Sequence, residues 1–388
     1  MNAAPSHIAP DGRSDATVNV AVNLLWCVPG KVGGSEQYLA RQLDGLGSQA
    51  SEFVPTIYCV RSFADAHPEL SARFELVAAE IDGTNRGRRV LAEHTWLARR
   101  TRSADVVHHG GGTAPAAGGR PIVLTIHDLQ YETFPEYVST TKLRYLRTAM
   151  PRSVARASVV AVPTQYVRGT VIEHFDVDPE RVVVVPHGVE PDLGARARSA
   201  AELRSAFALG GGRILVLPAI THPHKGHRFL LDVMARHWPD PDLRVVLLGG
   251  PGAADAAIRS DVARLGLEDR VVFAGRVDDA DRDGLIRLAD TLVFPSEYEG
   301  FGAPVVEAMA LGTPVVCSDQ PALSEVVADA GLSLPLDHEA WADVLDRVDR
   351  ERDAMVAAGL RRAQDFTTVA SGAGIASAYR LAHEVTAS

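Results

Sequence analysis

The first half of the chain alternates short apolar runs with amphipathic helical patterns. The apolar runs lie at 18–28, 53–60, 105–108, 122–126, 158–162 and 181–185. One helical pattern follows Ser35, and others lie near 88–101, 140–156 and 165–175. Short apolar strands separated by helices are typical of βαβ units, so this half predicts a parallel sheet with helices on both faces.

The second half repeats this alternation. Its predicted strands are 213–217, 243–248, 270–273, 291–294 and 314–317, and its predicted helices lie near 226–237, 253–265, 279–289, 303–311 and 322–328. Between the halves, 186–191 holds two prolines and a glycine, which predicts a linker. We therefore expect an α/β chain with two Rossmann-like, doubly wound parallel-sheet domains facing a central cleft, at 18–187 and 188–366.

Length and composition fit this reading. The chain has 388 residues, of which 46% are hydrophobic and 23% are charged, as in globular proteins of two domains. Residues 1–17 are polar and lack the pattern of a signal peptide, so we expect a disordered leader there. No apolar run approaches the roughly 18 residues that a membrane span requires. Three cysteines without metal spacing predict buried thiols and a cytoplasmic location.

The charge pattern narrows the choice of partners. The net charge is −10, which argues against a nucleic-acid partner. One basic cluster stands out, made of Arg86, Arg88, Arg89, Arg99, Arg100 and Arg102. We favour a solvated helix face for this cluster; the alternative is contact with anionic lipid or with a phosphorylated acceptor.

The segment from Glu299 to Glu307 carries the most specific chemical signal. It follows a predicted strand and opens a predicted helix. Glycines 300 and 302 allow the backbone to approach a ligand closely, and the free N–H groups of the helix suit a diphosphate or sugar hydroxyls. Glu299 is placed to accept hydrogen bonds from hydroxyls, and Glu307, about one turn into the helix, is placed to bind a ribose diol.

This segment also carries a resemblance to a known family. A Pro-Ser step, two glutamates separated by seven residues, and the following 308–316 resemble the signature of the large retaining glycosyltransferases of group 1 (family 4), which have the GT-B fold. The resemblance extends over nearly the whole chain from Val18 onward. It implies that Glu299 lies near the donor sugar, that Glu307 holds the nucleotide ribose, and that the last helix, 367–388, packs back on the first domain. The donor loop between the glutamates comprises Gly300, Phe301, Gly302 and Ala303.

A second signal lies between Thr221 and His227. Lys225 stands just before a helix and after a predicted strand, which is typical of a phosphate site. The family has an arginine several residues ahead of this lysine, whereas here the upstream positions are alanine and isoleucine. We expect His222 or His224 to take the place of that arginine.

Two further segments belong to the first domain. Gly33 and Gly34 follow the first strand and resemble the family's glycine loop, which closes over the diphosphate and the acceptor. His127 ends an apolar strand and precedes Asp128. The resemblance implies that His127 contacts the donor sugar and that Asp128 orients the loop.

Weaker signals lie at the ends of two strands of the second domain. Gly250 resembles the family's glycine turn near the nucleotide, and Arg276 and Val277 resemble the segment that meets the base. A dinucleotide fingerprint is ruled out here, because Asp255 stands where the third glycine would be. The linker resembles the hinge motif, in which His187 replaces the more common asparagine.

These signals together predict a hexosyltransferase. It would move a mannose- or glucose-type sugar from a nucleotide-diphosphate donor to an acceptor hydroxyl with retention, in cell-envelope glycan or glycolipid synthesis. The expected catalytic residues are His127, Lys225 and Glu299, with positive groups in place of a metal and no cofactor.

The acceptor remains open between a glycan, a lipid-linked and a small molecule, with peripheral contact at the inner membrane face. Two alternatives stay open. One is a sugar-nucleotide epimerase, which shares the architecture. The other is a catalytically silent partner of another transferase, favoured by the missing arginine.

Overall fold

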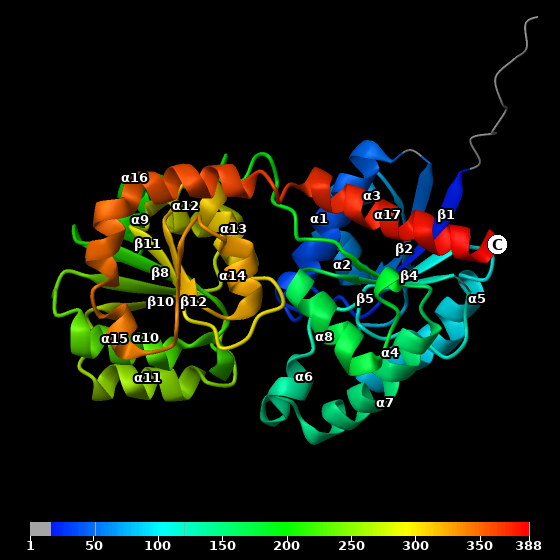
Figure 1. Cartoon of the computed structure of the whole chain (residues 1–388), viewed down its shortest axis with the longest axis horizontal. Coiled ribbons are helices and arrows are strands. Elements are labelled where there is room, and N and C mark those ends of the chain that lie inside the picture. Colours follow the sequence, from blue (N-terminus) through cyan, green and yellow to red (C-terminus); the bar gives the residue numbers. More distant parts are fainter. Residues whose placement is uncertain (1–16, 51, 120, 388) are drawn as a thin grey trace, which may run out of the picture.

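The computed structural model describes residues 17–50, 52–119 and 121–387, which form two α/β lobes joined end to end (Figure 1). The leader expected at 1–17 lies, apart from Thr17, outside the described residues. The prediction of two Rossmann-like parallel-sheet domains is confirmed.

Within the described residues, seven parallel strands form the sheet of the first domain, in the order β3-β2-β1-β4-β5-β6-β7. The strands are β1 Val18–Leu24, β2 Phe53–Val60, β3 Glu75–Ala79, β4 Val106–His109, β5 Ile122–Thr125, β6 Val159–Val162 and β7 Val182–Val184. Strands β4, β5 and β6 are buried along their whole length. Both faces of the sheet are covered, which explains the apolar runs of β5 and β6, while β4 ends in two buried histidines.

Helices cover both faces of this sheet. They are α1 Gly34–Gln49, α2 Arg61–Ala66, α3 Pro68–Ser71, α4 Arg86–Ala92, α5 Ala98–Arg100, α6 Gln130–Thr133, α7 Thr140–Arg156 and α8 Gln165–Phe175. Helix α1 and the last helix, α17 Thr368–Ala387, share one apolar core with β1 and β2. Helices α7 and α8 share another core with β5 and β6 on the opposite face.

The described part of the second domain holds a six-stranded parallel sheet in the order β10-β9-β8-β11-β12-β13. Its strands are β8 Ile214–Pro218, β9 Arg244–Leu248, β10 Val271–Gly275, β11 Thr291–Phe294, β12 Val315–Ser318 and β13 Leu332–Leu334. Its helices are α9 Ala200–Ala206, α10 His227–His237, α11 Asp255–Arg264, α12 Asp279–Leu288, α13 Ala303–Ala310, α14 Pro321–Val327, α15 His338–Ala342 and α16 Val344–Ala363.

Two strands, β3 and β13, were not predicted from the sequence. Both lie at the edge of their sheet, and both are short and partly exposed. An edge strand packs less apolar surface than a central one, so its sequence carries a weaker apolar run.

The chain passes between the domains twice, and the two crossings lie side by side. The linker crosses at Val189, and the turn between α16 and α17 crosses back at Phe366 (Figure 1). The Val189 amide donates to the Phe366 carbonyl at 2.8 Å, and the Thr368 amide donates to the Val189 carbonyl at 3.2 Å. The second crossing brings α17 back to the first domain.

Helices α1 and α17 pack with their backbones in close approach. Gly45 of α1 lies against Thr368 and Gly372 of α17, and a β-carbon at position 45 would collide with the Thr368 carbonyl oxygen. The glycine therefore serves the packing of the two helices rather than a turn.

We expect Gly45→Ala to lower the free energy of unfolding by about 1–3 kcal/mol, because the added methyl group forces the two helices apart. Gly169→Ala is the matched control, since Gly169 lies in α8 with open space around it and alanine favours a helix. Urea unfolding followed by circular dichroism measures both variants. Equal stability of Gly45→Ala and the wild type would contradict this account of the packing.

Candidate active site between the two domains

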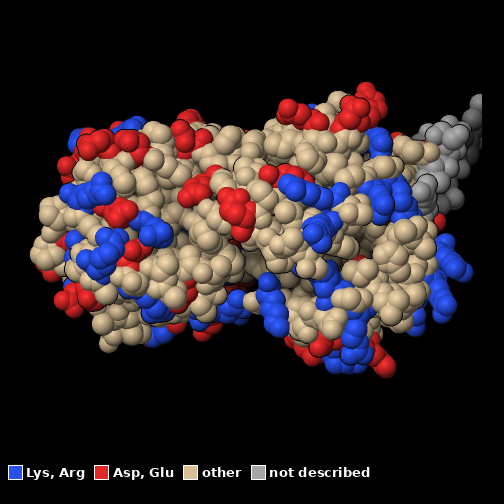
Figure 2. Space-filling model, turned by 90° about the horizontal axis from the view of Figure 1, so that it is seen from below, with Lys and Arg blue, Asp and Glu red and all other residues tan. Residues whose placement is uncertain are grey.

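The loops at the carboxyl ends of both sheets face each other. The Thr164 hydroxyl, after β6, donates to the Gly300 carbonyl at 2.9 Å, and the Leu129 amide, after β5, donates to the Tyr298 hydroxyl at 3.2 Å. Figure 2 shows the two lobes meeting at a waist, with the surface hollowed between them. In α/β sheets, ligands bind outside the carboxyl ends of the strands, so this region is the candidate site.

Lys225 and Glu299 form an ion pair in this region. The Lys225 Nζ lies 2.7 Å from Glu299 Oε1, and the two side chains are 20% and 11% exposed. Lys225 follows β8 and Glu299 follows β11, and these two strands are neighbours in the sheet. The sequence predicted both residues, and the structure brings them together.

Backbone contacts brace the two loops that hold this pair. Gly226 has φ of +70°, and a β-carbon there would collide with the Pro295 carbonyl oxygen. The Glu297 amide donates to the His224 carbonyl at 2.8 Å, and the Gln320 side-chain amide donates to the Glu299 carbonyl at 3.2 Å. These three contacts therefore fix the backbone of the two loops that carry the ion pair.

The histidines beside Lys225 are uncharged near neutral pH. Burial, followed by the charge of Lys225, lowers the pKa of His224 to about 3 and that of His227 to about 4. The same two causes lower the pKa of His222. Neither His222 nor His224 therefore supplies the positive charge of the family's arginine. Either histidine would take the place of that arginine only by hydrogen bonding to a phosphate.

His127 lies beside the Glu299 loop, because a β-carbon at Gly300 would meet its carbonyl oxygen. Its Nε2 is 2.9 Å from the Gly110 carbonyl, and its Nδ1 is buried without a partner among the described residues. A carbonyl only accepts, so Nε2 carries the proton. Burial lowers the pKa of His127 although Gly110 and Asp128 oppose this, so the ring is neutral and Nδ1 is an acceptor.

Glu307 is buried and faces the first domain. Its Oε1 accepts a hydrogen bond from Arg41 Nη1 of α1 at 2.8 Å, and its side chain is 6% exposed. Burial alone would raise the pKa of Glu307, but the guanidinium groups of Arg41 and Arg282 outweigh it and hold that pKa below its ordinary value. The carboxylate is therefore ionised.

Phe301 lies in an aromatic stack that crosses the domain boundary. Its ring stacks on His187 of the linker at 4.4 Å, and His187 in turn stacks on Tyr38 of α1 at 4.1 Å. Phe301 also contacts Phe366 at the second crossing. The sequence placed Phe301 among the donor-binding residues. In the structure this residue is 3% exposed, and its side chain lies in this stack.

The remaining predicted donor residues lie on the facing loops. Gly302 has φ of +92° and precedes α13, which begins at Ala303. Gly33 and Gly34 stand exposed at the start of α1, with open space where a side chain would lie.

Across the gap, Arg276 donates to the Gly30 carbonyl at 2.6 Å and lies close to Gly250. Val277 is half-buried and packs against the core of the second domain. The structure thus places Arg276, and not the Val277 side chain, at the domain boundary.

Sequence reasoning missed several residues that join the domains. The carboxylate of Glu325, on α14, accepts from the Gln165 and Tyr166 amides at the start of α8, at 2.8 and 2.9 Å. Arg41 also contacts Glu190 of the linker at 2.6 Å. No local pattern marks these residues, because each contact joins segments far apart in the chain.

Among the described residues, no group of three or more histidine, cysteine, aspartate or glutamate side chains is placed to hold a metal ion. No helix in the described part of the chain is long and apolar enough to cross a membrane.

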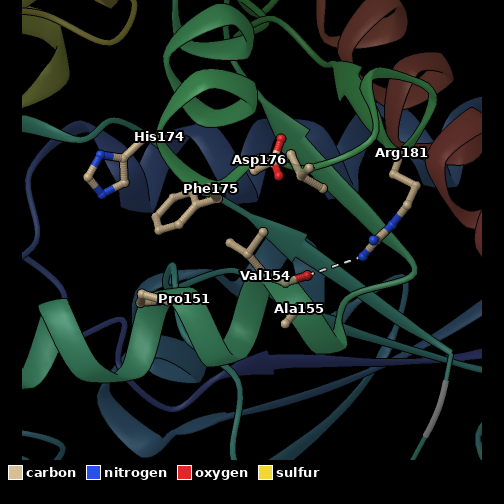
Figure 3. Close-up of a pocket in the computed structure, with 8 residues that line it drawn as sticks. Pro151, Val154, Ala155, His174, Phe175, Asp176 and Arg181 are labelled. Atoms are coloured by element: carbon tan, nitrogen blue, oxygen red, sulfur yellow. Dashed lines mark hydrogen bonds between the residues drawn. The ribbon is translucent and has the colours of Figure 1, made fainter.

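A separate pocket lies between α7 and α8, away from the facing loops (Figure 3). Arg181 borders it and donates to the Val154 carbonyl at 3.2 Å. His174 and Phe175 border it at the end of α8. None of the predicted site residues lines this pocket.

The buried histidines predict a loss of stability in acid. Their pKa values in the folded chain lie well below the ordinary value of about 6.5, so between these values the unfolded chain binds more protons. The contribution of these histidines to the free energy of unfolding should therefore be greatest above about pH 6.5 and should fall as the pH drops toward 4. Replacing His224 by asparagine should reduce this slope by up to about 1.4 kcal/mol per pH unit.

Urea titrations between pH 4.5 and 7.5 measure this slope. His383→Asn, at an exposed position on α17, is the control and should keep the wild-type slope. A His224→Asn slope equal to that of the wild type would show that His224 does not titrate as described.

Comparison with known proteins places the chain in a family. It matches glycosyl transferases group 1 over residues 211–349 and glycosyltransferase family 4 over residues 32–193. It is 31% identical over 272 residues to the O-antigen chain mannosyltransferase B of Escherichia coli, which covers 68% of this chain and 71% of that protein. It is 29% identical over 276 residues to the D-inositol 3-phosphate glycosyltransferase of Corynebacterium glutamicum, with 67% and 66% covered.

A solved structure shares the fold. HepE of Anabaena, in complex with UDP-glucose, has a TM-score of 0.71 and 21% identity, with 95% of this chain and 100% of that chain covered. The two family matches, the E. coli relative and this likeness all agree with the motif around Glu299. The chain therefore belongs to the group 1 glycosyltransferases, with the GT-B fold.

Proposed function

We propose that this glycosyltransferase moves a mannose- or glucose-type hexose from a nucleotide-diphosphate sugar to an acceptor hydroxyl, with retention and without a metal. The observation that carries this proposal is the ion pair of Lys225 and Glu299, which lies where the two sheets face each other, on a loop that meets the backbone of His127. A cation, an anion and a neutral histidine on the facing loop suit a sugar bound to a diphosphate.

Lys225 is the proposed contact for the leaving diphosphate. An ammonium group has three N–H donors, and Glu299 takes one of them at 2.7 Å. The remaining donors are left for phosphate oxygens. The free N–H groups at the start of α13, after Gly302, and those of Gly33 and Gly34 add positive potential without a side chain.

Glu299 and His127 are the proposed contacts for the sugar. Glu299 has a second carboxylate oxygen, which is able to accept from hydroxyls while the first holds Lys225. The Nδ1 of His127 accepts no hydrogen bond from the part of the chain that the structure describes, so a sugar hydroxyl directed at it would satisfy a buried polar atom.

The proposed reaction is a displacement on one face of the sugar. The bond from the anomeric carbon to the phosphate oxygen breaks, and the acceptor oxygen bonds to the same face of that carbon. The acceptor proton passes to the leaving phosphate, whose developing charge Lys225 stabilises. Loops that meet across the domain boundary, as Thr164 and Gly300 do, would keep water from the sugar.

The names of the relatives support the hexose and the setting. An O-antigen mannosyltransferase suggests a mannose-type donor, and UDP-glucose bound to HepE suggests a glucose-type donor. We propose a role in cell-envelope glycan or glycolipid synthesis.

The enzyme would act in the cytoplasm, where its three buried thiols would stay reduced. Arg100 and the other arginines of the 86–102 cluster lie at or near the surface of α4 and α5, and they offer a contact for an anionic acceptor or for the inner membrane face.

Lys225→Ala and Glu299→Ala should each lower turnover at least about a hundredfold, because each removes a contact to the reacting group. The assay measures release of nucleoside diphosphate from a panel of UDP-, GDP- and ADP-sugars, with the best wild-type donor used for the variants. Glu297→Ala, in the same loop but exposed, and Arg236→Ala, an exposed cation at the end of α10, are the controls.

The panel also separates the alternatives. Turnover at the wild-type rate in both site variants would contradict the assignment of the site. An epimerised donor recovered without any acceptor would favour the epimerase, and no turnover of any donor despite nucleotide binding would favour a silent partner.

Treatment with EDTA should leave the rate within about twofold of the untreated enzyme, because the lysine and the helix N-termini supply the positive charge that a metal would otherwise provide. The assay repeats the panel after dialysis against EDTA. A rate lost on dialysis and restored by Mg²⁺ or Mn²⁺ would contradict metal independence.

A further inference from the structure

One buried cation of the first domain lies against a proposed donor residue of the second. Arg41 lies in the middle of α1, is 4% exposed, and donates to Glu307 of α13 at 2.8 Å. Its Nε contacts Glu190 of the linker at 2.6 Å. One guanidinium group thus joins the first domain, the linker and the second domain.

The two helices that this contact joins both begin at the candidate site. Helix α1 starts directly after Gly33, and α13 starts directly after Gly302. Arg41 lies about two turns into α1, and Glu307 about one turn into α13. The contact therefore lies behind the helix N-termini and away from the N–H groups that would face a diphosphate.

Glu307 needs such a partner in order to act as a hydrogen-bond acceptor. A buried carboxylate without a positive neighbour takes up a proton and loses acceptor capacity. Arg41 contacts one oxygen of Glu307 and leaves further lone pairs for a ribose diol. The planar guanidinium also restricts the orientation of the carboxylate.

We propose that Arg41 is a positioning residue, which holds the Glu307 carboxylate in place for the ribose of the donor and so couples donor binding to the first domain. The inference rests on the proposed function, in which Glu307 binds the ribose. Arg41 acts through Glu307 and needs no contact with the donor.

The test measures binding of UDP, GDP and ADP to the full chain by isothermal titration calorimetry, using whichever binds the wild type most tightly. Arg41→Met should weaken that binding at least about tenfold, as expected when a buried ionised group loses its partner. Donor KM should rise likewise, while kcat stays within about threefold, because ribose contacts are made equally in the ground state and the transition state.

The pH dependence separates positioning from a general structural effect. The charged and titratable groups around Glu307 are Arg41, Glu190 of the linker, Arg282 of α12, and His187, which lies near Arg41. In the wild type Glu307 stays ionised across neutral pH. In Arg41→Met, the effect of burial on the pKa of Glu307 is opposed less. The ratio of the variant's Kd to the wild-type Kd should therefore fall as the pH rises from 6 to 8.5; taking the ratio at each pH removes the titration of the nucleotide phosphate itself.

Two controls use the neighbours of Arg41. Glu190→Gln removes the negative charge of the other partner of Arg41 and leaves the contact with Glu307, so binding should stay within about threefold of the wild type. In a Glu307→Gln background, Arg41→Met should weaken binding no further, since the two residues act as one unit. Arg41→Lys keeps the charge and should restore part of the affinity.

The outcomes separate this inference from the proposed function. If none of the three nucleotides binds the wild type, the proposed function fails. If a nucleotide binds the wild type and Arg41→Met equally well, or if Glu190→Gln weakens binding as much as Arg41→Met, the inference alone is overturned. If Arg41→Met does not fold, nucleotide binding is measured for Arg41→Lys in the wild-type and in the Glu307→Gln backgrounds. Losses of affinity that add up in the double variant would overturn the inference.

Discussion

One face of helix α1 contacts three other parts of the molecule, and the placing of the two domains depends on it. Tyr38 donates to the Val185 carbonyl, just before the linker, and stacks on His187 of the linker. Arg41, one turn later, reaches Glu307, and Gly45, another turn later, lies against α17. Residues spaced by three and four share one side of a helix, so a single element aligns the linker, the second domain and the last helix.

The sequence predicted the features that depend on residues close together in the chain. Strands, helices and the loops that carry Lys225 and Glu299 follow from apolar periodicity and from motifs that stay within a few residues of a strand end. The pairing of those loops follows because β8 and β11 are neighbours in one sheet. The contact between Arg41 and Glu307 could not be predicted, because it joins residues 266 positions apart. From sequence alone, an arginine inside an amphipathic helix is expected to be an exposed cation. The ring contacts of Phe301 could not be predicted for the same reason, because its partners come from the linker and the second crossing.

The loop around Lys225 shows how burial decides what a histidine contributes. Three histidines lie within a few residues of that lysine, yet their lowered pKa values leave Lys225 as the cation of the segment near neutral pH. With alanine and isoleucine upstream, the nearby positive charges are those of Lys225 and of Lys142, whose charge also lowers the pKa of His222. The N–H groups at the helix N-termini add to this positive potential, so the alignment of the helix ends also matters.

The place of α17 has a consequence for how the chain matures on the ribosome. The apolar core of the first domain includes Ile375, Tyr379 and Ala382 of α17, a helix that follows the whole second domain in the chain. The second domain, by contrast, has its whole sheet and the helices around it once α16 has emerged. The first domain therefore completes its apolar core after the second domain, which reverses the usual order of folding during synthesis. Until α17 has been translated, the face of β1 and β2 against which it packs stays uncovered.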